Sequence, residues 1–274
     1  MIRSLFFLSI LLASFAQAQL TIAVSVAPQA WLAKEIGGDL VNVIVIAPPD
    51  ASAHTYEPKQ SQLASLAKAN IYLACGIEFE RVWLDRFAAA APKMKIYATD
   101  SGVTKSKIES KAGSADDSRI WLSVAAMRSQ AQTTIRALSE TDPANMGKYQ
   151  INGMKLLQTI DRVKAQVASL LAPYREKAFL AYPPALGYVA KDYRLRQIAV
   201  DFRGEPKPAD IAELKEIVKN EGIRILLVQN GASAKTAQQL AKELGVQIEP
   251  INVMEDNWEA MMHALAVHLI NAFN

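Results

Sequence analysis

Short apolar runs alternate with amphipathic stretches along the first part of the chain. The apolar runs predict β-strands at 20–26, 41–46, 71–74 and 95–98. Apolar residues at helical spacing predict helices at 28–37, 59–69 and 80–90. Alternating strands and helices are typical of a parallel sheet covered by helices. This part of the chain therefore predicts an α/β lobe.

The same alternation returns in the last part of the chain. Strands are predicted at 177–182, 197–200, 223–229 and 247–251, and helices at 186–193, 208–221, 234–244 and 257–272. We therefore expect a second α/β lobe of similar size.

The segment between the two lobes has a different pattern. Residues 101–118 are rich in Ser, Lys, Gly and Asp, which predicts a surface loop, and a helix is predicted at 123–138. Residues 143–171 carry an apolar stripe at helical spacing, with Pro143 at the first helical position. A coiled-coil dimer is the alternative, but the stripe is too short to favour it, and we expect a monomer.

The predicted fold class is α/β, with two lobes whose parallel sheets are covered by helices and which one long helix joins. We divide the mature chain into an N-terminal lobe at 19–142, a linking helix at 143–172 and a C-terminal lobe at 173–274. A cleft between two lobes is a usual place for a small ligand.

The N-terminus predicts export. Arg3 precedes an apolar run at 5–15, and Ala16-Gln17-Ala18 has the small-x-small pattern that signal peptidase cleaves. The run is shorter than the roughly 20 apolar residues needed to cross a bilayer. We expect residues 1–18 to be a cleavable signal peptide and the mature protein to be periplasmic. No Cys sits at the cleavage site, which disfavours a lipid anchor.

Composition excludes several classes of protein. The formal charge is +3, or +2 without Arg3, and the basic residues are spread along the chain, so nothing indicates nucleic-acid binding. Cys75 is the one cysteine, which rules out an internal disulfide and a thiolate zinc cage. Its apolar neighbours predict a buried, unreactive thiol. The sequence has no GxSxG, phosphate-loop or HExxH motif, and we expect neither enzymatic activity nor a catalytic cofactor.

Several short motifs are spread over the whole mature chain. Residues 53–58 read AHTYEP, 119–123 read RIWLS, 184–193 read PALGYVAKDY, 205–208 read EPKP and 256–262 read DNWEAMM. In content and order they resemble motifs of the zinc/manganese-type (TroA-like, cluster A-I) solute-binding proteins of bacterial ABC importers. The resemblance implies a periplasmic receptor whose partners are a divalent metal ion, zinc or manganese, as the transported ligand, and an ABC permease in the inner membrane.

The resemblance also implies a metal site between the lobes, with up to four ligands. His54 stands at the first ligand position and Asp256 at the fourth, so we identify these two residues as metal ligands. Arg119 stands where the second ligand, a His, is expected, and Pro183 where the third, a His or Glu, is expected. The ligand set is therefore partly degenerate.

Arg119 and Pro183 change the chemistry of such a site. Pro183 has no donor side chain, and the guanidinium of Arg119 is permanently charged, offers no lone pair and repels a cation. Zinc prefers four ligands, so His54 and Asp256 leave half of the shell to water or other carboxylates. In the alternatives, Arg119 pairs with Asp256 or anchors an anionic ligand or a metal chelate. Asp256 is also a candidate N-cap of the last helix.

Further residues near the motifs are candidates for lining the cleft: Tyr56, Glu57, Trp121, Tyr188, Glu205 and Trp258. Plain packing is the alternative for the aromatic side chains. The segment 102–118 contains no His, which argues against a zinc-collecting loop, and His263 and His268 are predicted to be ordinary helix residues. Three functions stay open: a receptor for a divalent metal, the same scaffold with an anionic ligand at Arg119, and an interaction protein without a small ligand.

Overall fold

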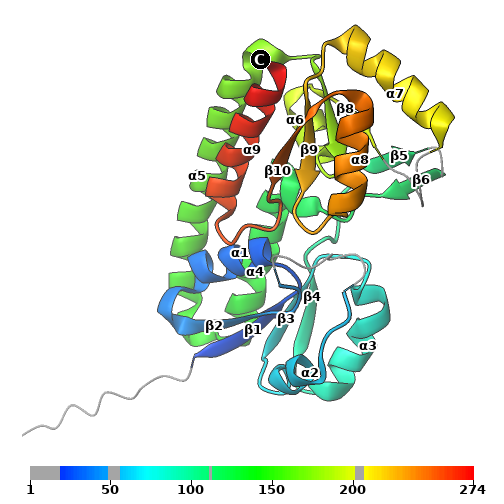
Figure 1. Cartoon of the computed structure of the whole chain (residues 1–274). Helices are drawn as coiled ribbons and strands as arrows, with labels where there is room; N and C mark the ends of the chain where they lie inside the picture. The colour runs from blue at the N-terminus through cyan, green and yellow to red at the C-terminus, as the bar shows by residue number, and fades with distance from the viewer. Residues whose placement is uncertain (1–18, 49–55, 111–112, 201–206) are drawn as a thin grey trace, which may run out of the picture.

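Two four-stranded parallel sheets form the centres of two lobes, one at each end of a long helix (Figure 1). The computed structural model describes residues 19–48, 56–110, 113–200 and 207–274 of the 274-residue chain. The predicted fold class is confirmed.

The sheet of the N-terminal lobe has the strand order β2-β1-β3-β4 and is parallel throughout. Its strands are β1 (Leu20–Val24), β2 (Val41–Val45), β3 (Ile71–Ala74) and β4 (Lys95–Ala98). Helices α1 (Ala27–Gly37), α2 (Gln60–Leu66) and α3 (Glu80–Ala90) follow the first three strands. All four residues of β3 are buried, as expected of a central strand that is covered on both faces.

The sheet of the C-terminal lobe has the strand order β10-β9-β7-β8 and is also parallel. Its strands are β7 (Ala178–Tyr182), β8 (Arg196–Ala199), β9 (Ile225–Gln229) and β10 (Gln247–Ile251). The helices of this lobe are α6 (Gly187–Tyr193), α7 (Pro208–Glu221), α8 (Ala234–Leu244) and α9 (Trp258–Phe273). In both sheets the carboxyl ends of parallel strands meet at one edge, which is where ligands bind in open α/β folds.

Two helices connect the lobes. Helix α4 (Val124–Thr141) leads through a short 3₁₀ turn (Pro143–Asn145) into α5 (Met146–Leu171). At 26 residues, α5 is about 39 Å long. It packs against α1 and α4 in the N-terminal lobe and against α9 in the C-terminal lobe (Figure 1). The predicted long helix is confirmed, except that its first turn is 3₁₀ rather than α-helical.

The prediction of a surface loop at 101–118 is wrong in part. Strands β5 (Lys107–Ser110) and β6 (Gly113–Asp116) form an antiparallel hairpin there, next to β8. An antiparallel ladder is held by backbone hydrogen bonds and does not require an apolar face, so the polar composition concealed it. An ion pair of 2.6 Å between Lys107 and Asp116 joins the two strands.

Among the residues that the structure describes, no helix combines the length and the apolar character needed to cross a bilayer.

Candidate functional site

Arg119 lies at the junction of the two lobes and is almost completely buried, with 3% of its surface exposed. Its Nε donates to Asp117 Oδ1 over 2.7 Å, and its Nη2 donates to the backbone oxygen of Pro184 over 2.6 Å. Pro184 follows β7, so this side chain connects the two lobes. The alternative in which Arg119 pairs with Asp256 is wrong, since Asp117 neutralises its charge.

Trp121, two residues after Arg119, and Trp258 make a second connection between the lobes. The indole Nε1 of Trp121 donates to the oxygen of Val253 over 2.7 Å, and that of Trp258 donates to the oxygen of Trp121 over 2.7 Å. Both side chains are buried, and Trp258 stacks on Trp31 with ring centroids 5.6 Å apart. These two indoles are therefore part of the core between the lobes, which is the packing alternative considered for them.

Tyr188, on α6, makes a third connection. Its hydroxyl donates to the backbone oxygen of Asp117 over 2.7 Å and accepts from the amide of Ser106 over 3.1 Å. Burial raises the pKa of Tyr188 to about 12, so the hydroxyl keeps the proton that it donates. Tyr188 thereby fixes α6 to both ends of the β5–β6 hairpin, since Ser106 precedes β5 and Asp117 follows β6.

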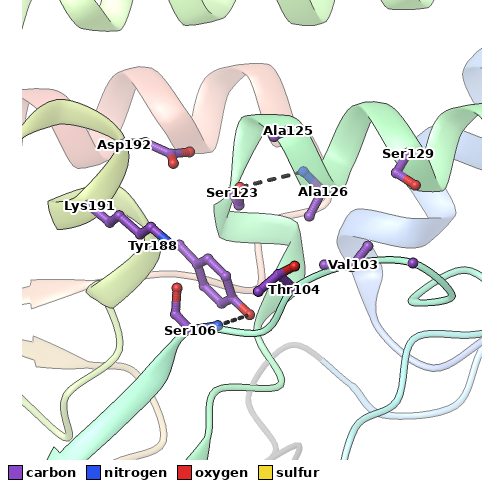
Figure 2. Close-up of a pocket in the computed structure, with 11 residues that line it drawn as sticks. Val103, Thr104, Ser106, Ser123, Ala125, Ala126, Ser129, Tyr188, Lys191 and Asp192 are labelled. Carbon is purple, nitrogen blue, oxygen red and sulfur yellow. Dashed lines mark hydrogen bonds between the residues drawn. The ribbon is translucent and has the colours of Figure 1, made fainter.

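Tyr188 also lines a pocket of about 360 Å³ between the loop at 102–106, the start of α4 and helix α6. Figure 2 shows Ser123 at the N-cap of α4, Ser129 on α4, and Lys191 and Asp192 on α6 around this space. Asp192 accepts a hydrogen bond from the amide of Val124 over 3.1 Å, and Ser123 caps the same helix end. Two amides in the first turn of α4, those of Val124 and Ala126, are thus bonded to side chains from both lobes.

A buried carboxylate organises the carboxyl ends of β1 and β3. Glu80 accepts hydrogen bonds from the amides of Cys75 (3.0 Å) and Gly76 (2.7 Å) and from the hydroxyl of Ser25. Burial raises the pKa of Glu80 although these hydrogen bonds oppose the shift. Cys75 is fully buried, and burial raises the pKa of its thiol well above the usual value, so the predicted buried thiol is confirmed.

The two residues identified as metal ligands are not brought together by any described contact. His54 lies outside the described residues, as does Glu205 among the candidate cleft residues. Asp256 is exposed, between β10 and α9. Its prediction as a helix cap is wrong, because the adjacent Asn257 accepts the hydrogen bond from the amide of Ala260.

The remaining candidates lie close to the junction but have different surroundings. Pro183 is half-buried next to Pro184. The hydroxyl of Tyr56 donates to Gln62 over 2.8 Å, and the ring contacts Phe79, whereas Glu57 is exposed. Within the described ranges, no group of three or more His, Cys, Asp and Glu side chains is placed to hold a metal ion.

Comparison with known proteins identifies the scaffold. A family model described as "ZnuA: Zinc-uptake complex component A periplasmic" matches residues 22–272 of the 274-residue chain. The chain belongs to the ZnuA family.

Solved structures and curated relatives agree with this assignment. A crystal structure of ZnuA superposes with a TM-score of 0.87 at 32% identity, covering 93% of this chain and all of that one. A zinc-bound variant of AdcAII of Streptococcus pneumoniae gives 0.76 at 25% identity, covering 91% and 99%. A "Putative metal-binding protein" of Treponema pallidum is 26% identical over 249 residues, which is 85% of this chain and 78% of that protein.

Membership of the ZnuA family fixes the general role. The chain is the solute-binding component of an ABC importer of the zinc/manganese type, and such proteins are not enzymes. ZnuA-family proteins are extracytoplasmic and deliver their ligand to an ABC permease. The resemblance to zinc/manganese-type solute-binding proteins that the short motifs indicated is confirmed.

Sequence reasoning missed Asp117 and Glu80, whose carboxylates are the buried ones among the residues that the structure describes. Asp117 has 1% of its surface exposed and holds Arg119 through both the side chain and the backbone amide, the latter over 3.0 Å. One signal in the sequence could have identified Asp117. It is an acidic residue two positions before Arg119, which stands where the ZnuA-type motif has a histidine. For Glu80 the sequence offered no signal, because it appears there as an ordinary first-turn acid of α3.

Proposed function

We propose that this protein captures a divalent metal ion, zinc or manganese, between its lobes and presents it to an ABC permease in the inner membrane. The observation that carries the proposal is the similarity to the ZnuA family over residues 22–272, together with a 32% identical ZnuA structure that superposes over 93% of the chain. A relative from Bacillus subtilis, 23% identical, is described as a "High-affinity zinc uptake system protein ZnuA".

The proposed ligands are His54 and Asp256, with water completing the shell. His54 follows β2 in the chain and Asp256 follows β10, so each comes after the carboxyl end of a strand in a different lobe. One imidazole and one carboxylate are an incomplete shell for zinc and leave room for oxygen donors, which manganese prefers. We therefore expect weaker zinc binding than a complete set of four protein ligands would give.

The electrostatics at the junction are compatible with a cation. Asp117 takes up the charge of Arg119 over 2.7 Å, so a nearby metal ion experiences much less repulsion than an unpaired guanidinium would exert. The same pairing counts against the anionic-ligand alternative, because Arg119 already uses Nε and Nη2 for protein acceptors. The third alternative, an interaction protein without a small ligand, predicts no metal binding at all.

Export and a monomeric state complete the proposal. We propose that residues 1–18, which lie outside the described residues, are the signal peptide and that cleavage follows Ala18. Mass spectrometry of the protein recovered from the periplasm tests the cleavage site, and light scattering tests the monomer.

Isothermal titration with zinc chloride and manganese chloride tests the metal site. We expect one ion per chain for the wild-type protein and a loss of at least about tenfold in affinity for His54→Ala and Asp256→Asn. The matched controls are His263→Ala, whose ring bonds to Gln166 and the Glu259 carbonyl, and Asp85→Asn on the exposed face of α3. Unchanged affinity in both ligand variants would reject these ligands, and no binding by the wild-type protein would reject the proposed function.

A further inference from the structure

Glu78 lies at the carboxyl edge of the N-terminal sheet, in the loop between β3 and α3. The residue is half-buried, and its carboxylate accepts a hydrogen bond from the hydroxyl of Ser118 over 2.8 Å. In the strand order β2-β1-β3-β4 the chain changes direction between β1 and β3. Ligands of open α/β sheets bind outside the carboxyl ends of the strands at such a point, so Glu78 stands at the expected edge.

The hydrogen bond from Ser118 places Glu78 beside the second of the four expected ligand positions. Ser118 directly precedes Arg119, which occupies that position. Arg119 donates to the backbone oxygen of Pro184 over 2.6 Å, and Pro184 follows Pro183, the third position. Glu78 is thus bonded to the residue next to one position whose usual donor is missing, and that position is bonded to the neighbour of the other.

A ring contact connects the same loop with the first ligand position. Phe79, the residue after Glu78, contacts Tyr56 edge to face, with ring centroids 6.1 Å apart. Tyr56 follows His54 by two positions in the motif that reads AHTYEP. The loop that carries Glu78 therefore contacts both motifs of the N-terminal lobe that carry an expected ligand position.

Backbone hydrogen bonds hold Glu78 in place. Glu80 accepts from the amides of Cys75 over 3.0 Å and Gly76 over 2.7 Å, which fixes the turn before Glu78. The backbone oxygen of Glu78 accepts from the amide of Arg81 over 3.2 Å, at the start of α3. A carboxylate on a fixed loop loses little conformational freedom when it binds an ion, which favours affinity.

Other carboxylates near the motifs are less suited to the same role. Glu57 is exposed, and Glu205 lies outside the described residues. Glu255 is exposed and accepts from the side chain of Asn252 over 2.7 Å. Glu78 combines partial burial with contacts to the ligand motifs, and it is the acid that these observations favour.

We propose that Glu78 is a third protein ligand of the metal ion and takes a position beside His54 and Asp256 that water would otherwise fill. This inference rests on the proposed function. An ionised carboxylate has two oxygens with about four lone-pair positions, so the bond from Ser118 is compatible with binding an ion through the same group.

A second carboxylate also suits the charge and the choice of the ion. Asp117 already neutralises Arg119, so Glu78 and Asp256 together balance the charge of a divalent cation. Oxygen donors suit manganese, whereas imidazole suits zinc. Glu78 therefore determines specificity, because it replaces a nitrogen donor by oxygen.

Isothermal titration of Glu78→Gln and Glu78→His with zinc chloride and manganese chloride tests the inference. Glu78→Gln keeps an oxygen that accepts from Ser118, so we expect an unchanged melting temperature in EDTA and a loss of at least about tenfold in affinity for both ions. Glu78→His should raise the ratio of zinc to manganese affinity by at least about tenfold. The matched control is Glu35→Gln, at an exposed position on α1.

The outcomes separate this inference from the proposed function. Wild-type protein that binds neither ion would reject both. Wild-type protein that binds an ion with an affinity that Glu78→Gln leaves unchanged would overturn the role of Glu78 alone. An unchanged ratio of zinc to manganese affinity in Glu78→His would overturn its role in specificity.

Crystals of the zinc-loaded wild-type protein provide a test that needs no variant. Anomalous scattering at the zinc absorption edge locates the ion, and we expect a carboxylate oxygen of Glu78 at roughly 2.0–2.2 Å from it. An ion bound between the lobes and out of reach of Glu78 would overturn the inference, even if Glu78→Gln failed to fold.

Discussion

Trp258 and Trp121 are joined by a hydrogen bond of 2.7 Å from the indole nitrogen of the first to the backbone oxygen of the second. Both side chains are buried, and the two residues lie 137 positions apart in the sequence. Because Trp121 in turn donates to Val253 over 2.7 Å, the start of α9 is fixed to the segment that follows the β5–β6 hairpin.

Replacing Trp258 by Phe tests the strength of this contact. The substitution keeps an aromatic ring but leaves the oxygen of Trp121 without its donor in the core, which costs about 1–3 kcal/mol. Urea unfolding measures the free-energy difference. Trp83→Phe is the control, since Trp83 is partly exposed and stacks on Phe87. Equal effects of the two substitutions would contradict the structural role of the Trp258–Trp121 bond.

Asp142, between α4 and α5, is expected to contribute stability that depends on pH. Burial alone would raise its pKa, but hydrogen bonds from Asn145 (2.8 Å) and Tyr149 (2.7 Å) lower it from the usual 3.8. A carboxyl whose pKa is lowered by folding stabilises the protein above its unfolded pKa, and this contribution is lost as pH falls through the folded pKa.

The variant Asp142→Asn is therefore expected to be less stable than the wild type by about 1 kcal/mol at neutral pH. This difference should shrink as pH falls below the usual carboxyl value of 3.8. Unfolding curves at a series of pH values provide the measurement, with Asp85→Asn as an exposed control. A difference that is independent of pH would show that ionised Asp142 is not the stabilising species.

The stability that Glu80 contributes should depend on pH in the opposite direction to that of Asp142. Burial raises its pKa from the usual 4.5, so its contribution is fully present below the unfolded pKa and is lost as pH rises through the folded pKa. Glu80→Gln cannot ionise, so the stability of the wild type relative to this variant should fall as pH rises above 4.5. If the unfolding free energy of the wild type minus that of Glu80→Gln stayed constant or rose with pH, the raised pKa of Glu80 would be contradicted.

Cys75 is expected to react with thiol reagents only when the protein opens. The side chain is fully buried, and burial together with the nearby Glu80 raises the pKa of its thiol well above the usual value. Modification by a chromogenic disulfide at mildly alkaline pH should therefore be slow in the native protein and complete after unfolding. Rapid stoichiometric modification of native protein would disprove the buried position.

The fold was largely predictable from the sequence because its elements carry local signals. Strand β3 and helix α8 were predicted at their observed bounds, since a continuous apolar run and a helical apolar stripe each specify one element. The β5–β6 hairpin was missed because its pairing depends on backbone hydrogen bonds rather than on an apolar pattern.

The site was less predictable, because its decisive contacts join residues that are distant in the chain. The hydrogen bond from Arg119 to the backbone oxygen of Pro184 joins residues 65 positions apart. Because the acceptor is a backbone atom, no pattern of side chains in the sequence predicts this bond. The motif-based resemblance assigned Arg119 and Pro183 to one site, and the structure supplied the partner of the charge, Asp117.

Elemental analysis of the protein purified from the periplasm without a metal-affinity tag tests the central claim most directly. We expect about one zinc or manganese ion per chain in the purified protein, or uptake of one ion after the empty protein is dialysed against either metal. Protein that is free of divalent metal as purified, and that takes up neither zinc nor manganese, would contradict the claim.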